Sequence, residues 1–305
     1  MKTKDVSKYK GIFPAFYACY DDAGEISVER VREFTEYLIG KGVNGLYVGG
    51  SSGECIYHSV AERKAVLEAV IEQAAGRITV IAHVACNNTR DSMELAAHAQ
   101  SVGADCIAAI PPIYFHLSDR AIAKYWSDIA SAAPETDFII YNIPQLAGVA
   151  LNSSLLHTML EIPNVIGVKN SSMPIQDIEM WRDEGAIVFN GPDEQLLSGL
   201  VAGAVGGIGG TYAAMPELYE KIYALVQAGD IASAREIQDT CCHIIYKMCS
   251  GVSNMYAMIK EILRLRDGPD IGSVRAPLYP MQPEDEDIAK ACAKDIDEAI
   301  AKFIK

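Results

Sequence analysis

The chain has 305 residues, of which 50% are hydrophobic, and its 26 basic against 40 acidic side chains give a formal net charge of −14. This length and apolar content allow one large α/β barrel or two smaller domains. The acidic excess argues against nucleic acid or an anionic membrane surface as a partner, because both would repel it. An acidic substrate stays open, because a local site can bind it whatever the total charge.

The eight cysteines predict no disulfide framework. None of them lies in a C-x-x-C pair, and we expect reduced, mostly buried thiols in a long chain without a secretory segment. Residues 1–10 are polar and lysine-rich and contain no apolar core, so we expect no signal peptide. No apolar run approaches the roughly 18 residues that a membrane span needs. Together these features predict a cytoplasmic protein.

Short apolar runs alternate with segments of helical periodicity through the first two thirds of the chain. Continuous apolar runs are typical of parallel strands that are buried on both faces. They predict strands at residues 11–18, 45–49, 78–84, 105–110, 137–142, 164–169, 186–190 and 205–209. The segments between them predict helices at residues 27–38, 60–74, 89–102, 118–132, 153–160, 176–181 and 193–202.

Eight strand–helix repeats without a break in composition predict an α/β fold, a (β/α)8 barrel. A doubly wound open sheet is the alternative, because strands are easily miscounted from one sequence. Beyond residue 216 no further strand is evident, and helices are predicted at residues 216–228, 231–249, 253–266 and 284–304. We therefore predict a catalytic barrel over residues 1–228 and a C-terminal helical extension over residues 229–305.

A lysine ends the sixth predicted strand, in the sequence Val165-Ile-Gly-Val-Lys169. Burying an unpaired ammonium group is costly, so the residue is unusual at the end of a buried strand. On its own, Lys169 is best explained as a side chain that reaches water or pairs with a carboxylate. In a (β/α)8 barrel, however, catalytic residues lie where strands end, which makes Lys169 a candidate nucleophile.

The second predicted strand ends in Gly49-Gly50-Ser51-Ser52-Gly53-Glu54, which we call the serine turn. Its glycines allow backbone N–H groups to approach a ligand closely, and its two hydroxyls add further donors. The turn is no P-loop, since no Gly-Lys-Ser/Thr follows, but it suits a small anion such as a carboxylate. A tight strand–helix turn without a ligand is the alternative.

Other strand ends carry polar or aromatic residues. A lone His83 is interpreted as a hydrogen-bonded packing residue, and Tyr114 and Tyr141 could equally be core aromatics with a hydrated hydroxyl. Asp193 and Glu194 either cap the next helix or hold a hydroxylated ligand. The glycines at residues 206–210 either cradle a phosphate or leave room for a bulky ligand, and no basic residue lies near them.

The strand ends contain no cluster of His, Asp and Glu residues that would hold a metal, which argues against a metal-dependent aldolase. They also contain no Gly-x-Ser-x-Gly nucleophile elbow. The nucleophile that remains is Lys169, and we expect neither a metal nor another cofactor.

Four motifs resemble, in order and spacing, the N-acetylneuraminate lyase / dihydrodipicolinate synthase family. They are the serine turn, Tyr141-Asn142-Ile143-Pro144, Gly167-Val168-Lys169 and Gly206-Gly207-Ile208-Gly209. The resemblance runs from Tyr9 to the C-terminal helices and is specific as a set, though not motif by motif. It implies a class I aldolase that forms a Schiff base with pyruvate, in a (β/α)8 barrel, usually as a homotetramer.

Within the family, the lyase branch fits better than the synthase branch. The synthases place an arginine two residues after the proline of the fifth-strand motif, where this chain has Leu146, or Gln145 with a shift of one. The usual Thr-Pro-Phe near the first strand is replaced by Ala18-Cys19-Tyr20, and Ser51-Ser52 replaces a Ser-Thr pair. A serine that contacts the sugar in the lyases is replaced by Gly210.

The resemblance implies a role for each candidate residue. Lys169 forms the imine, and Tyr141 carries protons and takes the one on the C4 hydroxyl. Ser51 and Ser52 hold the carboxylate of pyruvate, and Tyr114 joins a hydroxyl relay in a neighbouring subunit. Asp193 and Glu194 are expected to accept hydrogen bonds from the polyol tail of the sugar, with a backbone contact from Gly191. Ser171 is expected to place the central hydroxyl, and Gly210 is a further substrate-binding position.

These assignments predict a carbon–carbon lyase that acts on a keto acid and an aldehyde sugar, reversibly cleaving N-acetylneuraminate to pyruvate and N-acetylmannosamine. Three alternatives stay open. Two are sister activities, 4-hydroxy-tetrahydrodipicolinate synthase and an aldolase for 2-keto-3-deoxy sugar acids. The third is a catalytically idle relative that binds a keto acid as a regulator, against which the presence of both Lys169 and Tyr141 argues.

Overall fold

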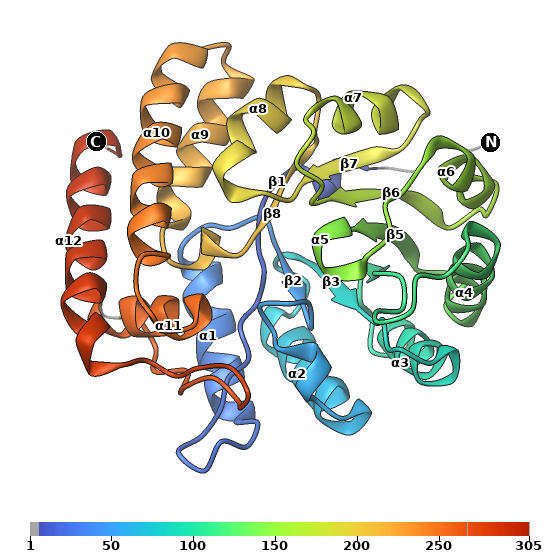
Figure 1. Cartoon of the computed structure of the whole chain (residues 1–305), viewed down its shortest axis with the longest axis horizontal. Coiled ribbons are helices and arrows are strands. Elements are labelled where there is room, and N and C mark those ends of the chain that lie inside the picture. Colours follow the sequence, from blue (N-terminus) through green and yellow to red (C-terminus); the bar gives the residue numbers. More distant parts are fainter. Residues whose placement is uncertain (1–5, 267, 305) are drawn as a thin grey trace.

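The computed structural model of the chain describes residues 6–266 and 268–304. The first five residues of the predicted barrel (1–5) and residues 267 and 305 of the predicted extension lie outside the described residues. Within the described ranges the chain forms an eight-stranded parallel sheet that curves into a barrel, with helices around it (Figure 1). The strands are β1 (Gly11–Pro14), β2 (Gly45–Val48), β3 (Thr79–His83), β4 (Cys106–Ala109), β5 (Asp137–Asn142), β6 (Val165–Asn170), β7 (Ile187–Asn190) and β8 (Gly206–Gly209).

Neighbouring strands pair in the order β1-β8-β7-β6-β5-β4-β3-β2. The ring closes between β1 and β2 through the single bridge of Ala15 to Tyr47 and the hydrogen bond from Phe16 N to Tyr47 O at 2.9 Å. The Asn44 side chain also accepts from Ile12 N at 2.7 Å. The predicted (β/α)8 barrel is therefore confirmed, and the open doubly wound sheet is wrong.

The helices that follow the strands lie outside the barrel (Figure 1). They are α1 (Val28–Gly40), α2 (Val60–Ala74), α3 (Thr89–Ser101), α4 (Asp119–Ala132), α6 (Ser153–Leu160), α7 (Gln176–Asp183), α8 (Leu196–Val201) and α9 (Pro216–Gln227). A further short helix, α5 (Pro144–Ala147), follows β5 directly and was not predicted. The segment predicted as one helix over residues 193–202 begins as a 3-10 turn, η3 (Asp193–Gln195), before α8.

Both faces of each strand are buried, which explains the continuous apolar runs. Phe13, Ile81, Ile139, Phe189 and Ile208 pack inside the barrel, while the alternate residues of the strands pack against the helices. The backbones of β1 and β8 approach closely at Gly206, where a Cβ would lie 2.1 Å from the Gly11 carbonyl oxygen. Only glycine fits there.

Three helices follow α9, namely α10 (Ile231–Met248), α11 (Met255–Leu265) and α12 (Glu286–Phe303). They lie together along one side of the barrel (Figure 1). The predicted boundary at residues 228 and 229 falls between α9 and α10, and the division into two units stays a prediction. No helix in the described part of the chain combines the length and hydropathy of a membrane span.

The cysteines match the expectation of reduced thiols. All eight are free, and five of them, Cys19, Cys55, Cys106, Cys241 and Cys292, are buried.

Candidate active site at the carboxyl ends of the strands

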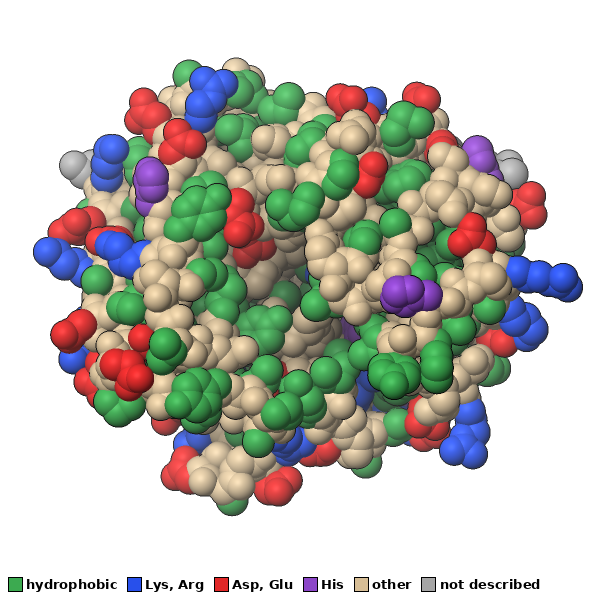
Figure 2. All heavy atoms as spheres, viewed as in Figure 1, with side chains coloured by type: hydrophobic (Ala, Val, Ile, Leu, Met, Phe, Trp, Pro, Cys, Tyr) green, Lys and Arg blue, Asp and Glu red, His purple; other side chains and the backbone are tan. Residues whose placement is uncertain are grey.

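A cavity of about 310 Å³ opens at the carboxyl ends of the strands. Figure 2, which looks onto the side that carries α5 and α11, shows a hollow near the centre of this face. Segments far apart in sequence line the cavity: Ala15, Tyr17, Tyr47, Ser51, Ser52, Tyr141, Ile143, Gln145, Leu146, Lys169, Ser171, Met173, Gly191, Pro192, Asp193, Glu194, Ile208, Gly210, Met255 and Tyr256. Lys169 is the one basic residue among them.

Lys169 points into the barrel, because its neighbour Val168 packs outward against the helices. The residue is only 5% exposed, and none of the described carboxylates lies within 4.0 Å of its nitrogen. Its Nζ lies 3.8 Å from the ring centroid of Tyr141 and 4.5 Å from that of Tyr47. Aromatic faces stabilise a cation without an ion pair. The explanation of Lys169 as a solvent-reaching or carboxylate-paired side chain is therefore wrong.

Tyr141 and Lys169 are direct neighbours across the sheet. β5 pairs with β6 in parallel, and the register places these two residues opposite each other. Tyr141 is 3% exposed and packs edge-on against Tyr47, with ring centroids 5.8 Å apart. The structure thus brings a buried amine and a phenol together, as the candidate assignments require.

The serine turn leaves β2 and forms one wall of the cavity. Ser51 and Ser52 both line it, as does Tyr256 of α11. Among the described residues, the backbone N–H groups of Ser51, Ser52 and Gly53 have no hydrogen-bond partner. Two hydroxyls and three open amides gathered in one turn suit the oxygens of a carboxylate.

Asp193 lies on the opposite wall, in η3. Its Oδ2 accepts from Thr211 N at 2.6 Å and from Thr211 Oγ1 at 2.5 Å, so the predicted cap on the following helix is wrong. The residue is 8% exposed, and burial raises the pKa of its carboxyl group to about 6. Its Oδ1 accepts no hydrogen bond from a described residue, which leaves it open to a hydroxyl of a ligand.

The remaining predicted contacts lie beside Asp193. Gly191 and Ser171 are neighbours, since a Cβ at Gly191 would meet Ser171 Oγ at 2.0 Å. A Cβ at Gly210 would meet nothing closer than Ser52 Oγ at 3.5 Å. The cavity is thus open at Gly210, between the serine turn and Asp193. Glu194 lines the same wall.

Tyr114 does not reach the cavity of its own chain. The residue is 87% exposed, has a left-handed backbone with φ of 87°, and packs edge-on against Phe115 with ring centroids 5.0 Å apart. Its role in a neighbouring subunit stays a prediction.

His83 is a packing residue, as predicted. It is 5% exposed, its Nδ1 lies 2.8 Å from the Gly49 carbonyl oxygen, and burial lowers its pKa to about 3. In residues 6–266 and 268–304 no three His, Cys, Asp or Glu side chains are grouped as a metal site would require.

Sequence reasoning missed the aromatic residues of the cavity wall. Tyr47 lies inside β2 rather than at its end, and Tyr17 follows β1 and donates to the Gly210 carbonyl oxygen at 2.5 Å. Tyr256 and Met255 come from α11, in the predicted extension. The spacing of hydrophobic residues in these segments does not indicate contact with a ligand, because an aromatic residue in an apolar stripe usually belongs to the hydrophobic core.

Comparisons with known proteins identify the family of the chain. Residues 8–297 match the dihydrodipicolinate synthetase family. The chain is 59% identical to an N-acetylneuraminate lyase of Mediterraneibacter gnavus over 99% of this chain and 96% of the relative. It is 34% identical to an N-acetylneuraminate lyase of Citrobacter koseri over 94% of this chain and 97% of the relative. The solved structure of a catalytic lysine mutant of the Ruminococcus gnavus sialic acid aldolase superposes with a TM-score of 0.97 at 59% identity, covering 98% of this chain and 99% of that one.

Proposed function

Since the chain belongs to the dihydrodipicolinate synthetase family, we propose that it is a carbon–carbon lyase that reversibly cleaves N-acetylneuraminate to pyruvate and N-acetylmannosamine. The observation that carries the proposal is the buried Lys169 amine over the ring of Tyr141, in a cavity with no other basic residue. The names of the relatives support the choice of substrate, since N-acetylneuraminate lyases match almost the whole chain.

In the proposed reaction, the neutral amine of Lys169 attacks the ketone carbon of N-acetylneuraminate and water leaves, which forms an imine. The protonated imine accepts electrons as the C3–C4 bond breaks, while Tyr141 takes the proton from the C4 hydroxyl. N-Acetylmannosamine departs and leaves an enamine on Lys169. Protonation of its C3 and hydrolysis of the imine release pyruvate. The imine takes the place of any cofactor.

The two walls of the cavity hold the two ends of the substrate in this proposal. The hydroxyls of Ser51 and Ser52 and the open amides of the serine turn donate hydrogen bonds to the carboxylate next to the reacting carbon. The polyol tail donates hydrogen bonds to Asp193 Oδ1 and to the Glu194 carboxylate, and it also contacts the backbone of Gly191. Ser171 lies beside the central hydroxyl of the sugar. Binding at both ends places the C3–C4 bond over Lys169 and Tyr141.

The direct test is to trap the imine. Borohydride reduction in the presence of pyruvate should add one pyruvate-derived group to Lys169 and to no other lysine, as read by peptide mass spectrometry. Lys169→Ala should remove both the adduct and turnover, because no other amine lines the cavity. Full activity in Lys169→Ala would refute the imine mechanism.

A sugar-acid aldolase is the second candidate, and the open space at Gly210 favours it. The synthase activity lacks support, because Gln145 and Leu146 line the cavity where an arginine would bind a dicarboxylic substrate. Pyruvate offered with a panel of aldehydes separates these activities. We expect N-acetylmannosamine to be the preferred partner, while binding without any turnover would indicate an idle relative.

A further inference from the structure

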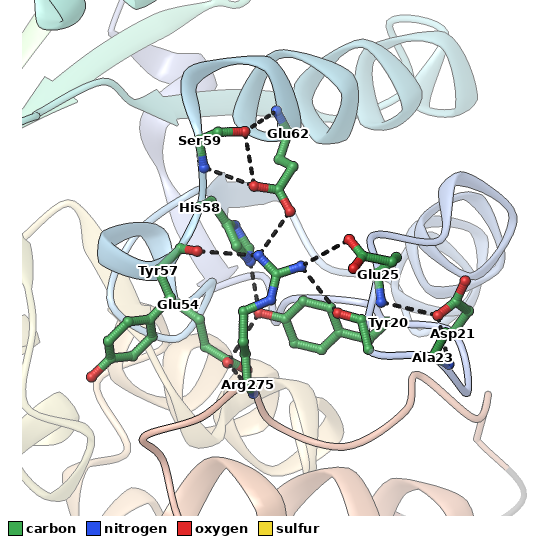
Figure 3. A network of polar contacts seen from close by, with 11 residues as sticks. Tyr20, Asp21, Ala23, Glu25, Glu54, Tyr57, His58, Ser59, Glu62 and Arg275 are labelled. Carbon is green, nitrogen blue, oxygen red and sulfur yellow. Dashed lines mark hydrogen bonds and ion pairs between the residues drawn. The ribbon is translucent and has the colours of Figure 1, made fainter.

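The serine turn ends on a carboxylate that is sealed inside the protein. The side chain of Glu54 is 0% exposed and accepts hydrogen bonds from Tyr20 Oη at 3.0 Å, Lys260 Nζ at 3.1 Å and Arg275 N at 2.8 Å. Figure 3 shows the carboxylate of Glu54 beside Tyr20 and the backbone of Arg275. Glu54 also has a left-handed backbone with φ of 51°, which is uncommon for a residue with a side chain.

The partner of Glu54 comes from the C-terminal extension. Lys260 lies on α11, its side chain is 3% exposed, and it also donates to the Ser273 carbonyl oxygen at 2.5 Å. Its Nζ lies 4.8 Å from the ring centroid of Tyr20. A contact across 206 residues of sequence therefore joins the turn to α11.

A second group of contacts lies beside Glu54 (Figure 3). Tyr20 Oη lies 2.6 Å from His58 Nε2, and Arg275 donates to Glu62 at 2.7 Å and to the Tyr57 carbonyl oxygen at 3.1 Å. Tyr57 and His58 follow the serine turn directly, and Glu62 lies in the first turn of α2. Side-chain contacts therefore hold the segment after the turn as well as Glu54.

Stability alone is a weak explanation for such a pair, because the loss of hydration of two buried charges often outweighs their attraction. The pair does, however, fix the position of the turn. Tyr256, one helical turn before Lys260 on α11, lines the cavity together with Ser52, so α11 faces the turn at two points. Between these points lie the open amides of Ser52 and Gly53.

We propose that Glu54 and Lys260 are positioning residues, through which α11 sets the geometry of the serine turn for the carboxylate of the keto acid. Neither side chain lines the substrate cavity, so both act through the turn. The inference rests on the proposed function, in which this turn binds pyruvate.

The test is Glu54→Gln, which keeps the shape of the side chain and removes its charge. In the synthetic direction the KM for pyruvate should rise at least about tenfold, because a small misplacement of binding groups is costly. The KM for N-acetylmannosamine should stay within about twofold, since the opposite wall is untouched. A pyruvate KM equal to that of the wild type would overturn the proposal.

A second variant separates loss of stability from loss of positioning. It is needed because Glu54→Gln leaves the Lys260 ammonium group buried without a carboxylate partner. Glu54→Gln combined with Lys260→Met removes both charges of the pair, so thermal stability should recover. The pyruvate KM should stay raised if the contact positions the turn, and should return to the wild-type value if the pair only balances charge.

Glu217→Gln is the matched control. Glu217, in the first turn of α9, pairs with Lys41 at the C-cap of α1 at 2.7 Å, and neither residue lines the cavity, so this change should leave the pyruvate KM unchanged. Borohydride trapping of wild-type protein keeps the two hypotheses apart. No adduct on Lys169 in the wild type refutes the proposed function, whereas a normal adduct with an unchanged KM in Glu54→Gln refutes only the positioning role.

Discussion

Gly210 determines how much room lies between Asp193 and the serine turn. A serine at this position would fit, because its Cβ would come no closer than 3.5 Å to Ser52 Oγ. Gly210→Ser should therefore fold normally and give the sugar one more hydrogen-bond partner. We expect the KM for N-acetylneuraminate to fall about two- to tenfold, the range of one hydrogen bond, in steady-state assays.

Its neighbour provides a steric control. A Cβ at Gly209 would lie 2.2 Å from Asp193 Oδ1 and 2.4 Å from the ring of Tyr212, so Gly209→Ser should lower both stability and activity. If Gly210→Ser and Gly209→Ser had the same stability and the same KM for N-acetylneuraminate, the space at Gly210 would not determine sugar binding.

Asp193 predicts a pH dependence of sugar binding. Burial raises the pKa of its carboxyl group to about 6, so the group is mostly ionised at pH 7 and mostly protonated at pH 5. The charged form accepts a hydroxyl hydrogen bond more strongly than the protonated form. The KM for N-acetylneuraminate should rise several-fold as the pH falls through 6, while the KM for pyruvate should not follow this curve.

Asp193→Asn separates this effect from other titrations. The amide does not ionise, so the variant should have a raised KM for the sugar that no longer changes between pH 7 and 5. If the KM of this variant for N-acetylneuraminate changed with pH as in the wild type, another group would be responsible for the pH dependence.

At the scale of single residues, Lys169 could be singled out from the sequence because a buried strand that ends on a lysine is unusual. Tyr141 became a candidate only through the family resemblance, and the structure places both residues on the cavity wall. The sequence did not allow Tyr17, Tyr47 or Tyr256 to be identified. Their apolar rings pack as core residues do, and only the closure of the barrel places them on the cavity wall.

At the scale of elements, strand positions could be predicted because both faces of each strand are buried and the apolar runs are continuous. The first strand was predicted too long, at residues 11–18, because residues 15–18 are buried but make only one bridge, at Ala15. The four residues of α5 are too few for a helical period to appear. Contacts between α11 and the serine turn depend on tertiary packing, which no local pattern encodes.

α10 supports the opposite wall of the cavity. Gln238, which is 5% exposed, accepts from Leu197 N at 2.9 Å and donates to the Asp193 carbonyl oxygen at 3.1 Å. Gln238→Leu would leave both backbone groups buried without partners. We expect the free energy of unfolding, from urea denaturation, to fall by about 2–3 kcal/mol, together with a higher KM for the sugar.

The residue next to it serves as a comparison. Asp239 is exposed on the same helix, and Asp239→Asn should change neither the unfolding free energy nor the KM. If Gln238→Leu behaved like this exposed variant, α10 would have no part in placing Asp193.

At the scale of the whole molecule, exposed apolar side chains follow β2 and β4, and we infer that they form a subunit contact. Ile56, Tyr114 and Phe115 are 62%, 87% and 71% exposed. Exposed aromatic pairs of this kind are typical of surfaces that bind another protein. The family resemblance implies a homotetramer, and light scattering of the purified protein should give four times the mass of 33.0 kDa.

The outward position of Tyr114 has a consequence for mixed assemblies. A subunit that offers this phenol to a neighbour does not need it for its own chemistry, so two different defects can compensate each other. Lys169→Ala and Tyr114→Phe subunits, each nearly inactive alone, should regain about a quarter of the wild-type rate when refolded together, because random pairing gives one complete site in every second pair. No complementation in such mixtures would mean that every barrel works with its own residues only.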